Sequence, residues 1–217
     1  QHRCRSMKFV VLLLACTSVV FVALAQEASP QKSVKESSDE FTSLLETAQM
    51  QMQAATGFHV EAVVFHGSNT IRLSGDISGD DFDIQLPALM RLKRAKNLYW
   101  ISRDAGVNWK PTGIDTAIYA LLISGLSAVP ENWRIATVRA EKGAEGVTTV
   151  LQLRSDIAPP EDYPEGADTV EFYVRETNGN PWIARFKGAA RFAGAVVMVD
   201  TTYSNLNGTL KIESPEP

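Results

Sequence analysis

Two periodicities of hydrophobic residues divide the chain into helical and strand-like segments. Between residues 37 and 56, the apolar residues form one narrow stripe at helical spacing, namely Phe41, Leu44, Leu45, Ala48, Met52 and Ala55. Ser37-Ser38-Asp39-Glu40 precedes the stripe and matches a capping box, and Gly57 follows it. The pattern predicts an amphipathic helix that starts near Ser37, ends at Gly57 and covers a larger element.

From Phe58 onward the period changes to two, which is typical of strands with one buried face. After the strand at 58–65, further strands are predicted near 70–77, 81–86, 97–103, 107–111, 133–140, 147–154, 169–176, 182–187, 191–200 and 208–213. Hairpin chemistry lies between several of them, in Asp104-Ala105-Gly106, in the KGAEG run at 142–146 and in Asn178-Gly179. Short hairpin turns make the neighbouring strands antiparallel. The sequence therefore predicts a mainly β protein with α (α+β), built on one large curved antiparallel sheet.

A second helix is predicted at 115–128, and it is apolar around most of its circumference. No charge lies between Asp115 and Glu131, and the apolar residues of IYALLISGL at 118–126 span roughly 200° of the helical wheel. Two interpretations remain open. The helix either plugs a packed barrel or covers a cavity that an apolar guest fills. Aromatic side chains on the strand-like runs can line one side of such a cavity. They are Tyr99, Trp100, Trp109, Trp133, Phe172, Tyr173, Trp182 and Phe186.

Residues 1–25 are expected to be an upstream remnant followed by a signal peptide. Lys8, an apolar run and Ala23-Leu24-Ala25 have the three parts of a secretory leader, and residues 1–6 precede Met7. Two alternatives are acylation at Cys16, within a lipobox-like Leu13-Leu14-Ala15-Cys16, and an uncleaved anchor. A flexible tether is expected at 26–35, followed by a single domain at 36–217. The expected location is therefore exported and periplasmic, with a lipid anchor or membrane association as the alternative.

Charge and residue chemistry narrow the function further. Without the three basic residues of the leader, 18 basic and 25 acidic side chains remain, a net charge of about −7, which argues against nucleic-acid binding. Both cysteines lie in the leader, so the mature chain has no disulfide or Cys metal site. No sequence motif for a catalytic triad, a zinc protease, a P-loop or a dinucleotide site is present. We therefore expect no cofactor, no metal and no enzymatic activity.

One basic run, RLKRAK at 91–96, stands out in this acidic chain. The plain interpretation is a solvated strand edge, where lysine discourages aggregation. The functional interpretation is contact with anionic headgroups through Arg91, Lys93, Arg94 and Lys96.

The order of these segments resembles the LolA/LppX-type carriers of lipoproteins and lipids in bacterial envelopes. The resemblance rests on the helix that ends at Gly57, the aromatic start of the next strand, NLYWISRDAGVNW at 97–109, the apolar helix and TLKIESPEP at 209–217. It implies an unclosed half-barrel covered by the N-terminal helix and a lid helix, with a lipid or an acylated lipoprotein as partner, transient membrane contact and a monomeric state. The implied ligand-binding residues are Trp109, Ile118, Tyr119, Leu122, Ile123, Leu126, Trp133, Phe172 and Trp182.

The sequence thus supports two hypotheses. The first is an exported carrier or chaperone that binds a hydrophobic ligand, either a lipid or lipoprotein acyl chains, in the concave face of the half-barrel. The second is an envelope sensor of the same fold that docks a membrane partner.

Overall fold

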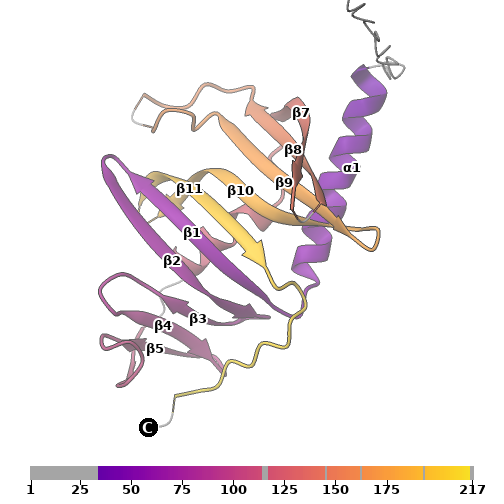
Figure 1. The fold of residues 1–217 in the computed structure, drawn as a ribbon. Coiled ribbons are helices and arrows are strands. Elements are labelled where there is room, and N and C mark those ends of the chain that lie inside the picture. The colour runs from indigo at the N-terminus through magenta and orange to yellow at the C-terminus, as the bar shows by residue number, and fades with distance from the viewer. Residues whose placement is uncertain (1–33, 114–116, 145, 162, 193, 216–217) are drawn as a thin grey trace, which may run out of the picture. The chain divides into compact units, whose positions relative to one another are not determined.

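The structure, a computed structural model, describes residues 34–113, 117–144, 146–161, 163–192 and 194–215 (Figure 1). The predictions for the leader, and for the tether up to residue 33, lie outside the described residues. Among the described residues, no helix combines the length and the apolar character needed to cross a membrane.

Within these described residues, eleven strands form one sheet in the order β6-β5-β4-β3-β2-β1-β11-β10-β9-β8-β7. All neighbouring strands are antiparallel. The strands are β1 (Phe58–His66), β2 (Asn69–Ser78), β3 (Asp81–Gln85), β4 (Arg91–Ala95), β5 (Leu98–Ser102), β6 (Lys110–Pro111), β7 (Trp133–Gly143), β8 (Gly146–Ser155), β9 (Thr169–Thr177), β10 (Asn180–Phe192) and β11 (Ala195–Ser204). Because β6 and β7 end the order and do not pair with each other, the sheet is unclosed, which confirms the predicted half-barrel.

Both helical segments cover the same face of this sheet, which we call the inner face. Helix α1 (Val34–Gln53) packs on β10 and β9, while α2 (Ala117–Leu122) and the 3-10 turn η1 (Ser124–Leu126) pack on β10. In β1, buried inner residues alternate with more exposed outer ones, and the buried set is Phe58, Val60, Ala62 and Val64. The alternation predicted from Phe58 onward therefore identifies the covered face correctly.

Several predicted strand limits are wrong. The basic run at 91–96 contains β4, which pairs with β3 and β5 and is therefore no edge strand. The segment at 208–213 forms no strand, although Leu210 and Ile212 are half buried. An alternating pattern predicts only that one side of a segment is buried. A strand also needs a neighbouring strand with a free edge. Strand β1 has no free edge, because it pairs with β2 on one side and β11 on the other. The predicted strand at 191–200 starts at Ala195, because β10 continues to Phe192.

The two helices also differ from their predicted limits. Helix α1 already includes Val34, so the helix starts before Ser37. The lid is shorter than 115–128, because the α-helix ends at Leu122 and only η1 follows it. Gly125 has a packing role that the sequence did not reveal. A Cβ at this position would lie 2.5 Å from the Cβ of Phe186, so only glycine allows the lid to approach β10 this closely.

Tyr203 of β11 connects the end of α2 to the sheet through a hydrogen bond. Its hydroxyl donates a hydrogen bond of 2.9 Å to the carbonyl oxygen of Leu122, the last residue of α2, and both residues are buried. Carbonyl groups in the last turn of a helix have no partner within the helix, so this bond satisfies one of them. Burial raises the pKa of the Tyr203 phenol, which therefore stays neutral and able to donate.

We expect Tyr203→Phe to lower the free energy of unfolding by about 1–2 kcal/mol, because the Leu122 carbonyl would stay buried without its donor. Chemical denaturation measures this change. Tyr163→Phe is the matched control, since the Tyr163 hydroxyl accepts only an exposed bond of 3.2 Å from Arg191. Equal losses in the two variants would contradict the role assigned to Tyr203.

Candidate ligand-binding site

An apolar cavity of about 310 Å³ lies on the inner face between α2 and the sheet. Its walls come from β1, β2, β10, α2 and the loop at 86–90 that joins β3 to β4. All ten lining residues are apolar, namely Val64, Ile71, Leu73, Leu86, Pro87, Ala88, Met90, Ile118, Leu121 and Phe192. The volume is at the lower end of the range of about 300–1,000 Å³ that ligand pockets in proteins show. A site without polar groups can bind alkyl or aryl groups but cannot perform acid–base chemistry on them.

The loop at 86–90 holds its shape through backbone conformations that side chains rarely adopt. Ala88 and Leu89 have φ angles of 57° and 62°. The Leu86 N–H donates to the Met90 carbonyl at 2.8 Å, which closes the loop. Pro87, Ala88 and Leu89 are exposed, Leu89 to 64%, whereas Leu86 and Met90 are half buried. Every residue of the loop except Leu89 lines the cavity.

A second loop, 103–109, supports the first one from the side of β5. The Ala105 N–H donates to the Leu89 carbonyl at 2.7 Å. Within this second loop, Asp104 accepts hydrogen bonds from the Ser102 hydroxyl at 2.6 Å and from the Asn108 backbone N–H at 2.9 Å. These bonds, that of Ser102 first, lower the pKa of Asp104 to about 2. The Asp104 carboxylate is thus a structural acceptor that keeps the neighbouring loop in place.

The predicted lid residues lie in three different environments. Ile118 lines the apolar cavity. Tyr119 stacks on Phe82 of β3, with 5.4 Å between the ring centroids. The other three pack into the core, where Leu122 and Leu126 are buried and Ile123 is half buried. The centre of the lid is therefore fixed by packing, and the hollow lies at its α2 end.

A second cavity of about 340 Å³ lies between α1, residues 128–131 and β7. The predicted site residue Trp133 lines it together with Leu45, Ile135 and the polar side chain of Glu46. The predicted site residue Phe172 lines neither cavity, and its ring packs 5.2 Å from that of Phe186 in the core. The inner face thus has one hollow against β1 and β2 and another against β7, with packed side chains elsewhere.

Trp109 and Trp182, two further predicted site residues, line neither cavity. The Trp109 ring lies 4.9 Å from the Lys93 ammonium and 5.7 Å from the Arg91 guanidinium, measured to the ring centroid. Trp182 donates from its indole nitrogen to the Thr177 hydroxyl at 3.2 Å and lines a different depression. Both side chains are aromatic, but neither contributes to the wall of the apolar cavity.

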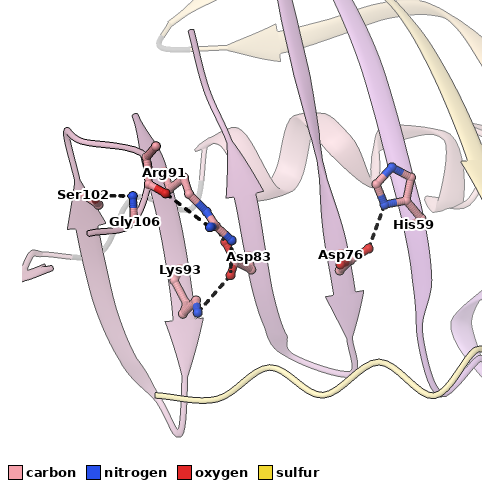
Figure 2. Close-up of polar contacts among 8 residues, drawn as sticks. His59, Asp76, Asp83, Arg91, Lys93, Ser102 and Gly106 are labelled. Carbon is pink, nitrogen blue, oxygen red and sulfur yellow. Dashed lines mark hydrogen bonds and ion pairs between the residues drawn. The ribbon is translucent and has the colours of Figure 1, made fainter. Parts of the chain in front are cut away.

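The four basic residues predicted to touch headgroups do not form one surface. Arg91 and Lys93 both bind the Asp83 carboxylate, at 2.7 and 2.9 Å, on the outer face of β3 and β4 (Figure 2). The Lys93 and Asp83 side chains are each only 14% exposed. Arg94 points to the inner side, where it donates to the Asp80 carbonyl and the Asn97 side chain. Lys96 lies in the β4–β5 turn with a φ of 53°. Headgroup contact by these residues stays a prediction, and three of the four charges, those of Arg91, Lys93 and Arg94, already have a carboxylate partner.

The outer face carries further pairs of polar and charged side chains. His59 Nδ1 lies 2.7 Å from Asp76 Oδ1 across β1 and β2 (Figure 2). Arg185 and Asp200 form a two-point ion pair with both distances at 2.6 Å. No group of three or more His, Cys, Asp or Glu side chains within the described ranges is arranged to hold a metal ion.

Sequence reasoning missed most of the cavity wall, although one signal for it was present. Leu86-Pro87-Ala88-Leu89-Met90 is an uninterrupted apolar stretch that joins two strands. Strand connections are normally polar because they run over the surface. A connection of this composition indicates either a buried loop or a wall of a site, and here it is the wall.

Comparison with known proteins identifies the same fold elsewhere. No protein family description and no curated protein matches the chain. Among solved structures, the chain is similar to LprF from Mycobacterium bovis at 14% identity, over 83% of this chain and 99% of LprF, with a TM-score of 0.54. It is also similar to the Mycobacterium tuberculosis lipoprotein LppX at 10% identity, over 79% of this chain and 99% of LppX, with a TM-score of 0.48. The likeness to LprF confirms the predicted LolA/LppX-type fold.

Proposed function

We propose that this protein is a non-enzymatic carrier that binds the alkyl chain of a lipid or of an acylated lipoprotein on the inner face of its half-barrel. The observation that supports this function is the cavity between α2 and the sheet, whose ten lining residues are all apolar. Apolar cavities of this kind bind apolar guests, because water gains nothing from entering them. The fold shared with LprF is consistent with this assignment.

The size of the cavity fits part of one alkyl chain. Each methylene group that leaves water for such a cavity contributes about 0.8 kcal/mol. A guest that fills the apolar cavity would therefore be held by burial alone. No polar recognition at the walls is required, so the cavity selects for length and width of the chain.

The proposed setting is the bacterial envelope, in agreement with the leader predicted at residues 1–25. In that setting the protein is a monomer that contacts a membrane transiently when it collects or delivers its cargo. The direct test is native mass spectrometry, or solvent extraction and lipid mass spectrometry, of gently purified protein. We expect a co-purified lipid. Empty protein that also fails to take up a fluorescent fatty acid would exclude the carrier function.

Met90→Glu is expected to weaken binding of a fluorescent fatty acid at least tenfold. Met90 is a half-buried wall residue, so the substitution places a carboxylate beside the guest while the side chain can still reach solvent. A titration of the purified variant with the fatty acid, followed by fluorescence, measures the loss.

Met50→Glu is the matched control for this substitution. Met50 lies on α1, is 60% exposed and does not line the apolar cavity. We expect it to bind the fatty acid as the wild type does, and chemical denaturation of both variants separates lost binding from lost folding. Equal affinity of a folded Met90→Glu variant and the wild type would place the guest elsewhere.

A further inference from the structure

The wall of the half-barrel has a gap between β2 and the loop at 86–90. Strand β2 runs from Asn69 to Ser78, but its pairing with β3 covers only Ser74–Ser78. The chain leaves β3 after Gln85 and turns at Pro87, so residues 69–73 of β2 have no paired strand on that side. On that side, residues 69–73 present their backbone N–H and C=O groups without a ladder partner, as at the edge of a sheet.

Two hollows adjoin at this gap, one on each face of the sheet. The first is the apolar cavity on the inner face. The second is an open groove of about 1100 Å³ on the outer face, which Val63, Arg72 and Leu89 line together with other residues. Four residues line both hollows, namely Leu73, Leu86, Pro87 and Ala88. A single thickness of apolar side chains therefore separates the inner cavity from the outer groove.

Arg72 is the cation at this position, and it lies on the outer face because its register partner is the outer residue Val63. Its side chain is exposed, and within the described parts of the chain no hydrogen bond or ion pair engages its guanidinium. The other arginine of the groove, Arg185, is already neutralised by Asp200. The remaining carboxylate of the groove is that of Glu61. Its register partner is Ser74, the residue at which the pairing of β2 with β3 begins, so Glu61 lies further from the gap than Arg72 does.

We propose that the cargo is an anionic amphiphile, whose alkyl chain occupies the inner cavity and whose carboxylate or phosphate binds Arg72 through the gap at 86–90. The proposal rests on the carrier function proposed above and specifies its substrate class. A guanidinium presents paired N–H donors that match the oxygens of a carboxylate or a phosphate. The alkyl chain packs against the neighbouring apolar wall. One amphiphile can therefore fill the apolar cavity and pair with the charge of Arg72.

Three ligands with the same sixteen-carbon chain test the proposal: palmitate, hexadecyl phosphate and the uncharged hexadecanol. Their affinities are measured by displacement of a fluorescent fatty acid from the full chain. We expect the wild type to bind both anions about tenfold more tightly than hexadecanol, the size of one hydrogen-bonded charge. Arg72→Ala should remove this preference and leave hexadecanol binding unchanged, while Arg72→Lys should keep part of it. Stronger binding of hexadecyl phosphate than of palmitate would indicate a phospholipid, and the reverse a fatty acid.

Lys142→Ala is the control for a general charge effect, because Lys142 lies on β7, the last strand of the strand order, and lines neither hollow. The preference for anions should persist in this variant. Equal binding of all three ligands by the wild type, or an anion preference that survives Arg72→Ala, would overturn the headgroup assignment while leaving the carrier function intact. Failure to bind any of the three would overturn both.

Discussion

Replacing Phe82 with alanine is expected to lower the free energy of unfolding by about 3–5 kcal/mol, the usual range for truncating a buried aromatic side chain. Phe82 is 2% exposed on β3 and stacks on Tyr119 of α2, with 5.4 Å between centroids and 19° between planes. Its edge also meets the Tyr99 ring at 6.2 Å. The substitution therefore opens a void in the core and removes the aromatic contact that holds α2 over β3. Denaturation by urea, followed by circular dichroism, measures the loss.

Phe65→Ala provides the same chemical change without the packing. Phe65 lies on the outer face of β1 and is 42% exposed, so we expect a loss below about 1 kcal/mol. Ligand binding adds a second measurement. If Phe82 positions α2, the alanine variant should also bind the fluorescent fatty acid more weakly at temperatures where it is still folded. A loss no larger than that of Phe65→Ala would show that the aromatic stack contributes little.

Gly125→Ala is expected to cost about 1–3 kcal/mol through overpacking. The added Cβ would lie 2.5 and 2.6 Å from two carbons of Phe186, a buried residue that β10 and the ring of Phe172 hold in place. Alanine is ordinarily favoured over glycine in helical segments by about 1 kcal/mol, so the sign of the effect distinguishes packing from propensity. Thermal and urea denaturation both report it.

Gly113→Ala is the corresponding control, because a Cβ at residue 113 would meet no atom within 4 Å. We expect it to be neutral or slightly stabilising. A stabilised Gly125→Ala variant would mean that the lid moves away from Phe186 easily, and that its close approach is not required for folding.

Hydrophobic periodicity encodes some features of this structure and leaves others open. The stripe that contains Leu45, Ala48 and Met52 predicts α1 and its buried side, and the alternation after Phe58 predicts the inner face of β1. The Asn178-Gly179 turn is confirmed by φ angles of 53° and 78° at these two residues. Each of these features depends on neighbours close in sequence, and local pattern was sufficient for them.

Features that depend on distant partners were not predicted. Strand β4 is hidden because Arg91 and Lys93 read as a charged, solvated edge, whereas their shared partner Asp83 lies on the adjacent strand. The packing role of Gly125 depends on Phe186, which is distant in sequence, so no local pattern indicates it. Of the nine predicted ligand-binding residues, Ile118 lines the apolar cavity. The other predicted residues are also apolar or aromatic. Whether such a side chain reaches a cavity is determined by the strand register and by where the helices end.

The missing closure between β6 and β7 has a consequence for the range of guests that this protein can accommodate. In a closed barrel, strand number and stagger fix the diameter, so a wider guest would require ladder hydrogen bonds to break. Here the eleven-stranded order has two free ends, and small changes of twist between neighbouring strands can add up along it. The interior can thus widen or narrow while every strand keeps its partners, a property that suits the proposed carrier function with alkyl chains of different width.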